Sequence, residues 1–294
     1  SLDGGSTMNY IGYNWSNDRT NWSSPVIIDY ENPSNLYFGS YRVWATQDGG
    51  NNWSPISGDL TNGDDGSGYH TITTLSLSPH DNSIILAGTD DGNVYITTNS
   101  GSEWEKISDS LPERWITRVS FDPHNPNNIY VTLSGFRWDE EVSHVFASYD
   151  LGQTWMNISS NLPDLPVNCI VLDPEKIDNI YIGTDSGVFF SNNGGENWQS
   201  FSYNIPKTPI TDLKIHNQTR KLVCGTYGNS AFSFDLNQMQ LGDLNNDDEL
   251  NVFDIVIMVN YILEGVYEYN GDINEDGILN IIDCILLVNL ILDN

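Results

Sequence analysis

A short motif that recurs along most of this chain constrains its fold more than any other feature. At residues 148–155 the motif reads SYDLGQTW, and it returns as TQDGGNNW at 46–53, TTNSGSEW at 97–104 and SNNGGENW at 191–198. An Asp or Asn at the third position accepts hydrogen bonds from N–H groups of its own turn, and Gly at the fifth position tolerates a positive φ. The motif therefore predicts a β-hairpin turn whose returning strand is anchored by Trp. A partial copy with Met in place of Trp, SLDGGSTM, stands at 1–8.

The segments between these motifs repeat as well. Each contains two short apolar strands separated by a turn rich in Asp, Asn, Pro or Ser. The five segments contain VIIDYENPSNLYFGS, TLSLSPHDNSIILAGT, ITRVSFDPHNPNNIYVTLSG, CIVLDPEKIDNIYIGT and LKIHNQTRKLVCGT. A repeat of roughly 45 to 50 residues that is filled with short strands is typical of β-propeller blades. We therefore predict a mainly β protein built around a propeller of about five four-stranded blades.

The motif resembles the Asp-box of the BNR-repeat proteins, a group that includes sialidases, two-propeller xyloglucanases and sortilin-like domains. The resemblance covers residues 1–237 and implies an Asp-box β-propeller there. It also implies that each box caps an outer hairpin of a blade, far from the central face where ligands bind. Asp48, Asp150 and the Asn residues that replace them in other boxes are accordingly interpreted as structural rather than catalytic.

The two ends of the repeat region complement each other. The last segment ends in a strand at 231–236 with no box after it, whereas the chain begins with a box that has no blade before it. We predict that residues 7–11 pair with residues 231–236 and close the ring, because each strand otherwise leaves an unpaired edge. The alternative is that these are five blades of a larger propeller or of a two-propeller protein.

One face of the propeller is the expected binding face. In a propeller, the loops between strands 2 and 3 of a blade and the loops that join successive blades share one side, where ligands usually bind. Aromatic residues in these loops suit sugar rings or peptide side chains. The candidates are Tyr69, Trp115, Trp138 and Tyr227.

Glycoside cleavage requires two carboxylates that flank one bond. The candidates on the expected face are Asp90, Asp139, Glu140 and Asp185, and their spacing selects no pair. The Phe-Arg-Ile-Pro-like segment of sialidases is absent, and Arg118 is the one arginine in a predicted innermost strand, so an arginine clamp for sialic acid is not expected. Xyloglucanases act in a cleft between two propellers, and one propeller is predicted here. Enzymatic activity stays open, with binding favoured.

The composition restricts the partners of the chain. Its formal charge of −29 repels nucleic acid and anionic lipid and favours cations. Neither Lys nor Arg follows Lys221, so the C-terminal region is the most acidic part. No apolar run is long enough to span a membrane. The three cysteines stand singly in apolar runs, which indicates buried thiols.

A different pattern begins after residue 237. Two acidic loops, DLNNDDELNVFD from Asp243 and DINEDGILNIID from Asp272, each lead into an apolar helix, at 254–263 and 283–292. Both loops place oxygen-bearing side chains at positions 1, 3, 5, 9 and 12 and a carbonyl at position 7, as calcium loops of the EF-hand type do. The predicted ligands of two calcium ions are Asp243, Asn245, Asp247, Glu249, Asn251 and Asp254, and Asp272, Asn274, Asp276, Ile278, Asn280 and Asp283.

This duplicated loop and helix unit resembles a type I dockerin. The resemblance implies a small helical domain at 242–294, after a linker at 238–241, that folds with two calcium ions and binds a cohesin-like protein. Two departures bear on the partner. Asp248 stands where position 6 is usually Gly, and positions 10 and 11 are apolar at 252–253 and 281–282, where Ser or Thr is usual.

Together these features predict a bacterial protein that is secreted or associated with the cell surface. We expect a propeller that recognises a glycan or protein ligand and is tethered by its calcium-dependent dockerin. The alternative is a polysaccharide-degrading glycoside hydrolase of the xyloglucanase or sialidase-like type. A third possibility is a structural module of a larger surface protein.

Overall fold

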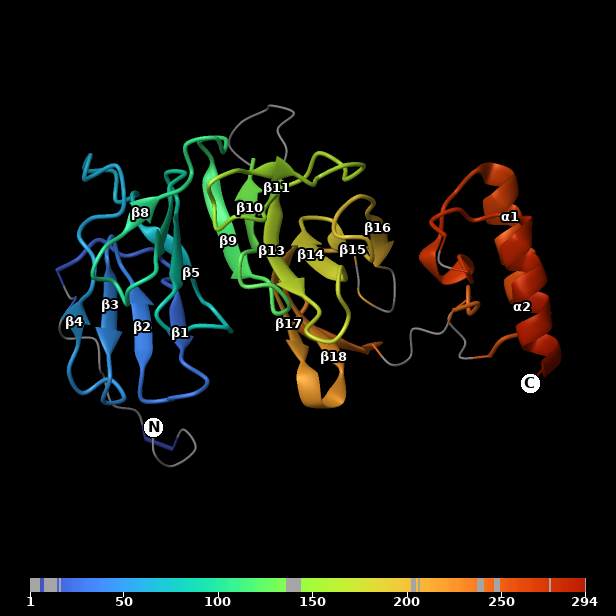
Figure 1. Cartoon of the computed structure of the whole chain (residues 1–294), viewed down its shortest axis with the longest axis horizontal. Helices are drawn as coiled ribbons and strands as arrows, with labels where there is room; N and C mark the ends of the chain where they lie inside the picture. The colour runs from blue at the N-terminus through green and yellow to red at the C-terminus, as the bar shows by residue number, and fades with distance from the viewer. Residues whose placement is uncertain are drawn as a thin grey trace.

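The structure is a computed structural model that describes residues 6–7, 15, 17–135, 144–201, 205, 207–236, 241–245, 249–274 and 276–293. Five antiparallel sheets follow one another along the chain, and two helices come after them (Figure 1). Four of the described sheets have four strands and the fifth has three. This organisation confirms the prediction of a mainly β protein with a propeller architecture.

Each sheet is a simple meander of neighbouring antiparallel strands. The first holds β1 (Val26–Ile28), β2 (Leu36–Gly39), β3 (Val43–Thr46) and β4 (Ser54–Pro55), and the second holds β5 (Ile72–Leu77), β6 (Ile85–Thr89), β7 (Val94–Thr97) and β8 (Glu105–Lys106). The third holds β9 (Trp115–Phe121), β10 (Ile129–Ser134), β11 (Val145–Ser148) and β12 (Met156–Asn157), and the fourth holds β13 (Val167–Leu172), β14 (Ile180–Thr184), β15 (Gly187–Ser191) and β16 (Gln199–Phe201). The fifth holds β17 (Ile210–His216), β18 (Lys221–Thr226) and β19 (Ala231–Asp235).

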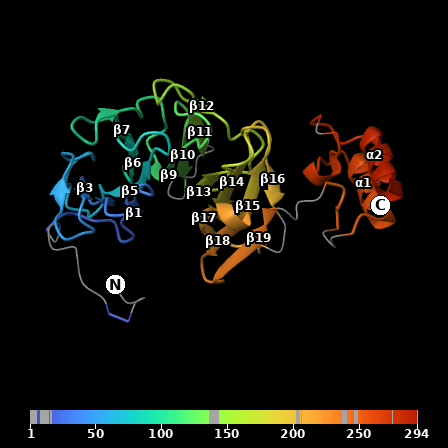
Figure 2. The ribbon, with the colours of Figure 1, turned by 60° about the horizontal axis from the view of Figure 1, so that its bottom comes forward.

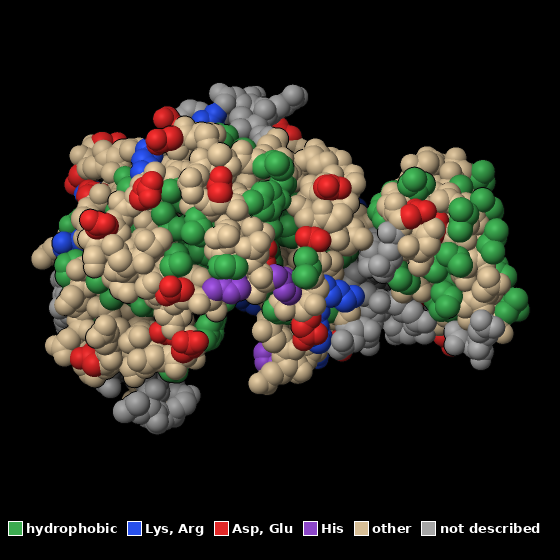
Figure 3. All heavy atoms as spheres, in the orientation of Figure 1, with side chains coloured by type: hydrophobic (Ala, Val, Ile, Leu, Met, Phe, Trp, Pro, Cys, Tyr) green, Lys and Arg blue, Asp and Glu red, His purple; other side chains and the backbone are tan. Residues whose placement is uncertain are grey.

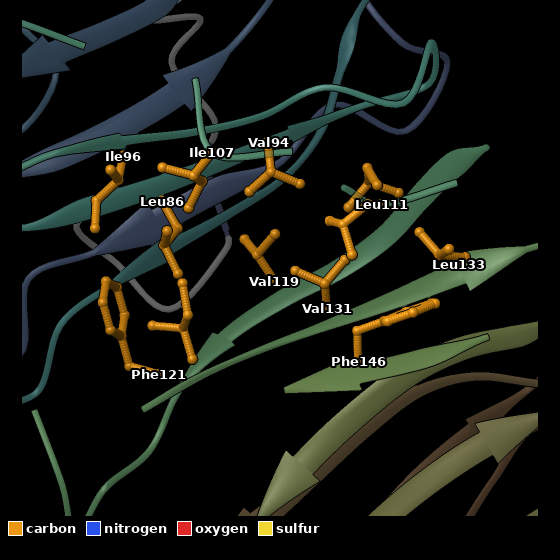
Figure 4. Packing of buried hydrophobic residues seen from close by; sticks show 12 residues of the cluster. Leu86, Val94, Ile96, Ile107, Leu111, Val119, Phe121, Val131, Leu133 and Phe146 are labelled. Carbon is orange, nitrogen blue, oxygen red and sulfur yellow. The ribbon is translucent and has the colours of Figure 1, made fainter. Parts of the chain in front are cut away.

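The first strands of successive sheets lie next to one another. β5 contacts β9, β9 contacts β13, and β13 contacts β17. The sheets consequently follow an arc, with the first and fifth sheets at its two ends (Figure 2). Apolar side chains fill the space between neighbouring sheets, as Leu86, Ile107 and Val131 do between the second and third (Figure 4).

The predicted ring closure lies outside the described residues, because residues 8–14 are not among them. On the described side, Trp15 packs on the first sheet, with its ring stacked 4.2 Å from that of Phe38 and edge-on at 4.7 Å from that of Trp53.

The recurring box is a hydrogen-bonded turn, as its sequence predicts. In the third sheet, Ser148 Oγ donates to Asp150 Oδ1 at 2.7 Å, and Thr154 N donates to the same oxygen at 2.8 Å. Gly152 N donates to Ser148 Oγ at 2.7 Å, and Gly152 has a φ of 91°. The hydrogen bonds from Thr154 and Ser148 lower the pKa of Asp150.

In the second, third and fourth sheets the box also joins the blade to the preceding one. Trp155 Nε1 donates to the carbonyl oxygen of Ile107 at 2.6 Å, and the box glycine Gly152 lies so close to Ile107 that a Cβ would overlap that side chain. The second and fourth sheets repeat this joint, with Trp104 bonded to Ile56 at 2.9 Å and Trp198 bonded to Ile158 at 2.8 Å. We call this pair of contacts the Trp–Ile joint.

After β19 the chain forms α1 (Val252–Glu264) and α2 (Ile281–Asp293), which pack against each other through Met258, Cys284 and Leu287. Asn251 caps α1 by accepting from Phe253 N, with Asp254 as the reciprocal partner, and Gly265 ends it with a φ of 67°. All three cysteines are buried and free, as predicted. In the described part of the chain, no helix combines the length and apolar character needed to cross a membrane.

Candidate binding face and C-terminal loops

Two loops of the expected binding face meet between the first and second sheets. One runs from β4 to β5 and the other from β6 to β7. Asn62 N donates to Asp91 Oδ2 at 2.7 Å, and Thr71 donates to Asp90 through its N–H and its hydroxyl, each at 2.8 Å. His70 Nδ1 lies 2.7 Å from Asp91 Oδ2. We call Asn62, His70, Thr71, Asp90 and Asp91 the mouth cluster.

The loop that leads into the third sheet joins the mouth cluster. Gly92 has a φ of 87°, and a Cβ there would lie 3.1 Å from Arg114 N and from the Cα of Glu113. Trp115 follows directly as the first residue of β9, where it is half-buried and pairs with Ser134 of β10. The loops of three successive blades therefore share one face, as the fold predicts.

The carboxylates of the mouth cluster differ in their electrostatics. Burial raises the pKa of Asp90, although the hydrogen bonds from Thr71 oppose this shift. Asp91 accepts from Asn62, from Thr89 and, at 2.8 Å, from Asn93 Nδ2. The pKa of Asp90 is thus shifted in the direction that general acids require.

His70 is held between two carboxylates. Its Nδ1 faces Asp91 and its Nε2 lies 3.2 Å from Asp65 Oδ2. The hydrogen bonds to Asp91 and then to Asp65 raise the pKa of His70, while burial opposes them. His70 also has a φ of 67°, a backbone region that non-glycine residues seldom adopt. The sequence did not reveal this role, since the five histidines are scattered and follow no motif.

Of the other predicted site residues, Tyr69 adjoins the mouth cluster, whereas Asp185 and Tyr227 lie in loops of the fourth and fifth sheets. Tyr69 precedes His70 and is 44% exposed. Asp185 accepts from Asn168 at 2.9 Å in the fourth sheet, and Tyr227 is exposed after β18, where its N–H donates to the Pro209 carbonyl. Among the described residues, no hydrogen bond or ion pair joins Asp185 or Tyr227 to the mouth cluster. Trp138, Asp139 and Glu140 lie outside the described residues.

Arg118 takes part in a contact that the sequence did not indicate. Its guanidinium donates to Asp212 Oδ1 at 2.6 Å, which links β9 to β17 although β13 lies between them. Both side chains are partly exposed. This arginine is therefore paired with an acidic residue of the chain.

A groove of about 520 Å³ lies beside the Trp–Ile joint of the second sheet. It runs between the outer strands of the first and second sheets and is lined by residues 55–60, 101–104 and Tyr95. Trp104 contributes its ring, but its Nε1 is already bonded to Ile56 in the Trp–Ile joint. The groove therefore lies against the joint, and residues 56–60 of the loop from β4 to β5 also line it.

The two C-terminal acidic loops are closed in the same way. In the first, Asp254 Oδ1 accepts from Leu244 N at 2.8 Å, and Asp254 Oδ2 accepts from Asn251 N at 2.9 Å. In the second, Asp283 Oδ1 accepts from Ile273 N at 3.0 Å, and its Oδ2 accepts from Asn280 N at 2.9 Å. The duplication read in the sequence thus extends to the hydrogen bonds of the loops.

The first carboxylate of the second loop is held by three donors. Asp276 N donates to Asp272 Oδ1 at 3.1 Å, whereas Gly277 N and the Tyr267 hydroxyl donate to Oδ2 at 2.8 and 2.9 Å. Gly277 has a φ of 80°, which explains the glycine at position 6 of this loop. Its counterpart Asp248, and Asp247, lie outside the described residues.

The donor set of these loops suits a hard cation. Asp243, Asp254, Asp272 and Asp283 are at most 3% exposed, and the sequence offers no Lys or Arg after Lys221 to neutralise them. Carboxylate, amide and carbonyl oxygens are the ligands that Ca²⁺ prefers. In the side-chain arrangement of the described residues, however, no three His, Cys, Asp or Glu groups gather closely enough to hold a metal ion.

Both helices carry an exposed apolar stripe. Phe253 on α1 is 67% exposed and Ile282 on α2 is 51% exposed, and hydrophobic side chains cover much of the C-terminal module in Figure 3. Five exposed positions of α1 recur on α2 29 residues later in the sequence, and α2 also exposes Leu290, whose counterpart Tyr261 is partly buried. The stripes comprise Val252, Phe253, Val256, Val259 and Leu263, and Ile281, Ile282, Ile285, Val288 and Leu292.

Comparison with solved structures identifies similar propellers. An ancestral GH74 enzyme is 21% identical, with a TM-score of 0.54 over 68% of this chain and 27% of that chain. The GH74 xyloglucanase from Xanthomonas campestris is 15% identical, with a TM-score of 0.56 over 74% and 37%. The β-propeller domain of Cps50 (Swd1) from Myceliophteria thermophila is 16% identical, with a TM-score of 0.56 over 76% and 69%. No protein-family model and no curated protein matches the sequence.

At these identities the likeness establishes the fold alone. The chain spans 27% and 37% of the lengths of the first two GH74 proteins, so it corresponds to only part of each. The neighbours nevertheless include glycoside hydrolases, which agrees with the expected class of any enzymatic activity. The chain therefore has a β-propeller fold similar to that of GH74 enzymes, followed by two C-terminal helices.

Proposed function

We propose that this chain is an extracellular recognition protein in which the propeller binds a glycan or protein ligand and a dockerin-like module attaches it to a cohesin-like partner. The observation that carries the attachment is the pair of exposed apolar stripes on α1 and α2. Exposed apolar patches that recur at equivalent positions are typical of interaction surfaces.

Burial of the stripes in an interface would favour association. Full burial of one Val, Leu, Ile or Phe side chain contributes about 1.5–3 kcal/mol, and each helix offers five such residues. Part of this gain offsets the entropy lost on association. Because the two stripes place apolar residues at equivalent positions, one partner surface would be able to engage either helix.

Two calcium ions are proposed to fold this module. The first would be held by side chains of Asp243, Asn245, Asp247, Asn251 and Asp254 and the carbonyl of Glu249. The second would be held by side chains of Asp272, Asn274, Asp276, Asn280 and Asp283 and the carbonyl of Ile278. Calcium would supply the positive charge that the loops lack, and the buried carboxylates would then no longer oppose closure.

The test is binding of the full chain to immobilised, purified cohesin domains in calcium and in excess chelator. We expect binding in calcium only. The double change Phe253→Asp and Ile282→Asp should abolish it, because a charge would then enter each apolar stripe. Tyr30→Ser is the matched control, since Tyr30 is 90% exposed but belongs to the propeller. Equal binding of the double variant, or binding that persists in chelator, would contradict the proposal.

A second candidate function is glycoside hydrolysis. The raised pKa of Asp90 within the mouth cluster favours it, together with the likeness to GH74 enzymes. The full chain should be assayed on xyloglucan, other plant and algal polysaccharides and sialosides. Asp90→Asn should then lower kcat by at least about 100-fold, as removal of a general acid does, while leaving the melting temperature nearly unchanged. An active chain whose kcat is unaffected by this change would exclude Asp90 as the acid.

A further inference from the structure

Tyr267 lies between α1 and the second C-terminal loop, and it makes two contacts of different kinds. Its hydroxyl donates to Asp272 Oδ2 at 2.9 Å. Its ring packs against the hydrophobic cluster of the fourth and fifth sheets, which contains Phe201 and Leu236. One side chain therefore joins the propeller to the first carboxylate of an acidic loop.

We infer that Tyr267 is a positioning residue that couples calcium binding at the second loop to docking of the C-terminal module on the fifth sheet. The inference rests on the proposed function, in which Asp272 is a calcium ligand. Tyr267 itself would not touch the ion.

The hydroxyl acts through the orientation of Asp272. Oδ2 accepts from both Tyr267 and Gly277, and Oδ1 accepts from Asp276 N at the longer distance of 3.1 Å. Two donors on one oxygen fix the plane of the carboxylate and leave the other oxygen the more available for a cation. Groups that orient a metal ligand in this way typically change metal affinity by 10- to 100-fold when they are removed.

The ring acts through the edge of the propeller. The fifth sheet is the one described sheet with three strands, and β19 forms its margin. Phe234 of β19 packs edge-on against Phe201 at 5.2 Å, and Leu241 and Tyr267 pack against the same cluster from the C-terminal side. Leu241 and Tyr267 thus pack on apolar residues of the fourth and fifth sheets, to which β19 contributes.

The coupling should be confined to the second loop. The two loop and helix units match at their acidic positions. Tyr267 stands five residues before Asp272, but the residue five positions before Asp243 is Gln238. A glutamine lacks both the aromatic ring and the phenol. The two calcium sites are therefore expected to respond differently to changes at the contact with the propeller.

Reciprocity makes the inference testable. If docking orders Tyr267 and thereby strengthens calcium binding, calcium must strengthen docking by the same factor. The observables are the affinity of each site by calorimetry on the full chain and the hydrogen exchange of the β19 amides. For the unchanged chain we expect two calcium ions per molecule and slower exchange in β19 when calcium is present.

Three variants separate the two contacts. Tyr267→Phe keeps the ring and removes the hydroxyl, so one of the two sites should weaken by about 10-fold or more while the other is unchanged. Tyr267→Ala should weaken the same site and also remove the protection of β19 by calcium. Tyr261→Phe is the control, because Tyr261 lies in the core of the module and its hydroxyl has no bond to Asp272.

Each outcome has a distinct meaning. Two sites of unchanged affinity in Tyr267→Phe would overturn the role of the hydroxyl, and calcium protection of β19 in Tyr267→Ala would overturn the docking role. Absence of calcium binding by the unchanged chain would instead refute the proposed function, and the inference with it. A loss in Tyr261→Phe equal to that in Tyr267→Phe would show a general effect of removing a phenol from this module.

Discussion

The link between the fourth and fifth sheets provides the sharpest test of how this propeller is held together. Arg220, which follows the turn between β17 and β18, donates to both oxygens of Asp173 at 2.9 and 2.7 Å. Asp173 is 1% exposed and also accepts from Glu175 N at 2.9 Å. The pair is therefore a bidentate and buried connection between neighbouring blades.

Arg220→Met removes the charge and leaves the Asp173 carboxylate buried without its cation. Breaking a buried pair in this way typically costs about 3–5 kcal/mol. For a chain of this size, each kcal/mol lowers the melting temperature by about 2–4 °C, so we expect a decrease of about 6–20 °C by calorimetry. Arg118→Met is the matched control, because its pair with Asp212 is partly exposed and such pairs contribute about 0–1 kcal/mol.

The pH dependence gives an independent check of the same reasoning. Burial opposes ionisation of Asp173, but the hydrogen bonds and charge of Arg220 outweigh it, so the pKa of Asp173 is lowered in the folded protein. A lowered pKa contributes stability that is present above the ordinary Asp value of about 3.9 and is lost as pH falls through the folded-state pKa. The difference between the parent chain and Arg220→Met should therefore shrink in acid. Equal stability of the two proteins at pH 7 would refute the argument.

Three further predictions follow from other features. Gly152→Ala should lower the free energy of unfolding, measured in urea, by about 1–3 kcal/mol, because the new Cβ would overlap Ile107 at a residue with a positive φ. Gly49→Ala should cost less, because Gly49 also has a positive φ, of 70°, but has open space around it. The pKa of His70 is raised, so its contribution to holding the mouth cluster is fully present below about pH 6.5 and is lost as pH rises through the higher folded-state pKa. Amide exchange in residues 62–70, corrected for intrinsic rates, should therefore increase at pH 9 in the parent chain. It should not increase in His70→Gln. Deletion of residues 1–12 should lower the melting temperature if they close the ring, and an unchanged soluble monomer would exclude that closure.

The sequence predicted the elements that depend on local chemistry. Each of the five repeated segments forms a pair of antiparallel strands, as predicted, and the box turns formed because Ser, Asp and Gly within eight residues satisfy one another. Helix α1 was predicted from residue 254 but begins at Val252, because Asn251 caps it from within the acidic loop.

Contacts between distant segments left no local signal. Arg220 and Asp173 lie 47 residues apart, and Arg118 and Asp212 lie 94 apart, so periodicity and spacing did not pair them. The location of Asp90 and Trp115 on one face was predicted from the propeller topology alone. The placement of His70 between two carboxylates depended on a backbone conformation that the sequence does not specify.

The Trp–Ile joint has a consequence for how the number of blades can change in evolution. The Trp donor and the Ile acceptor are 48 residues apart in the sequence for Trp104 and for Trp155, and 40 residues apart for Trp198. Each separation is close to the length of one repeat. A tandem duplication of one repeat would therefore bring both halves of a new joint with it, and loss of one repeat would bring two compatible halves together. Recombination among such blades can lengthen or shorten the array without a new kind of interface, because the second, third and fourth sheets each supply a Trp donor to an Ile acceptor of the preceding blade.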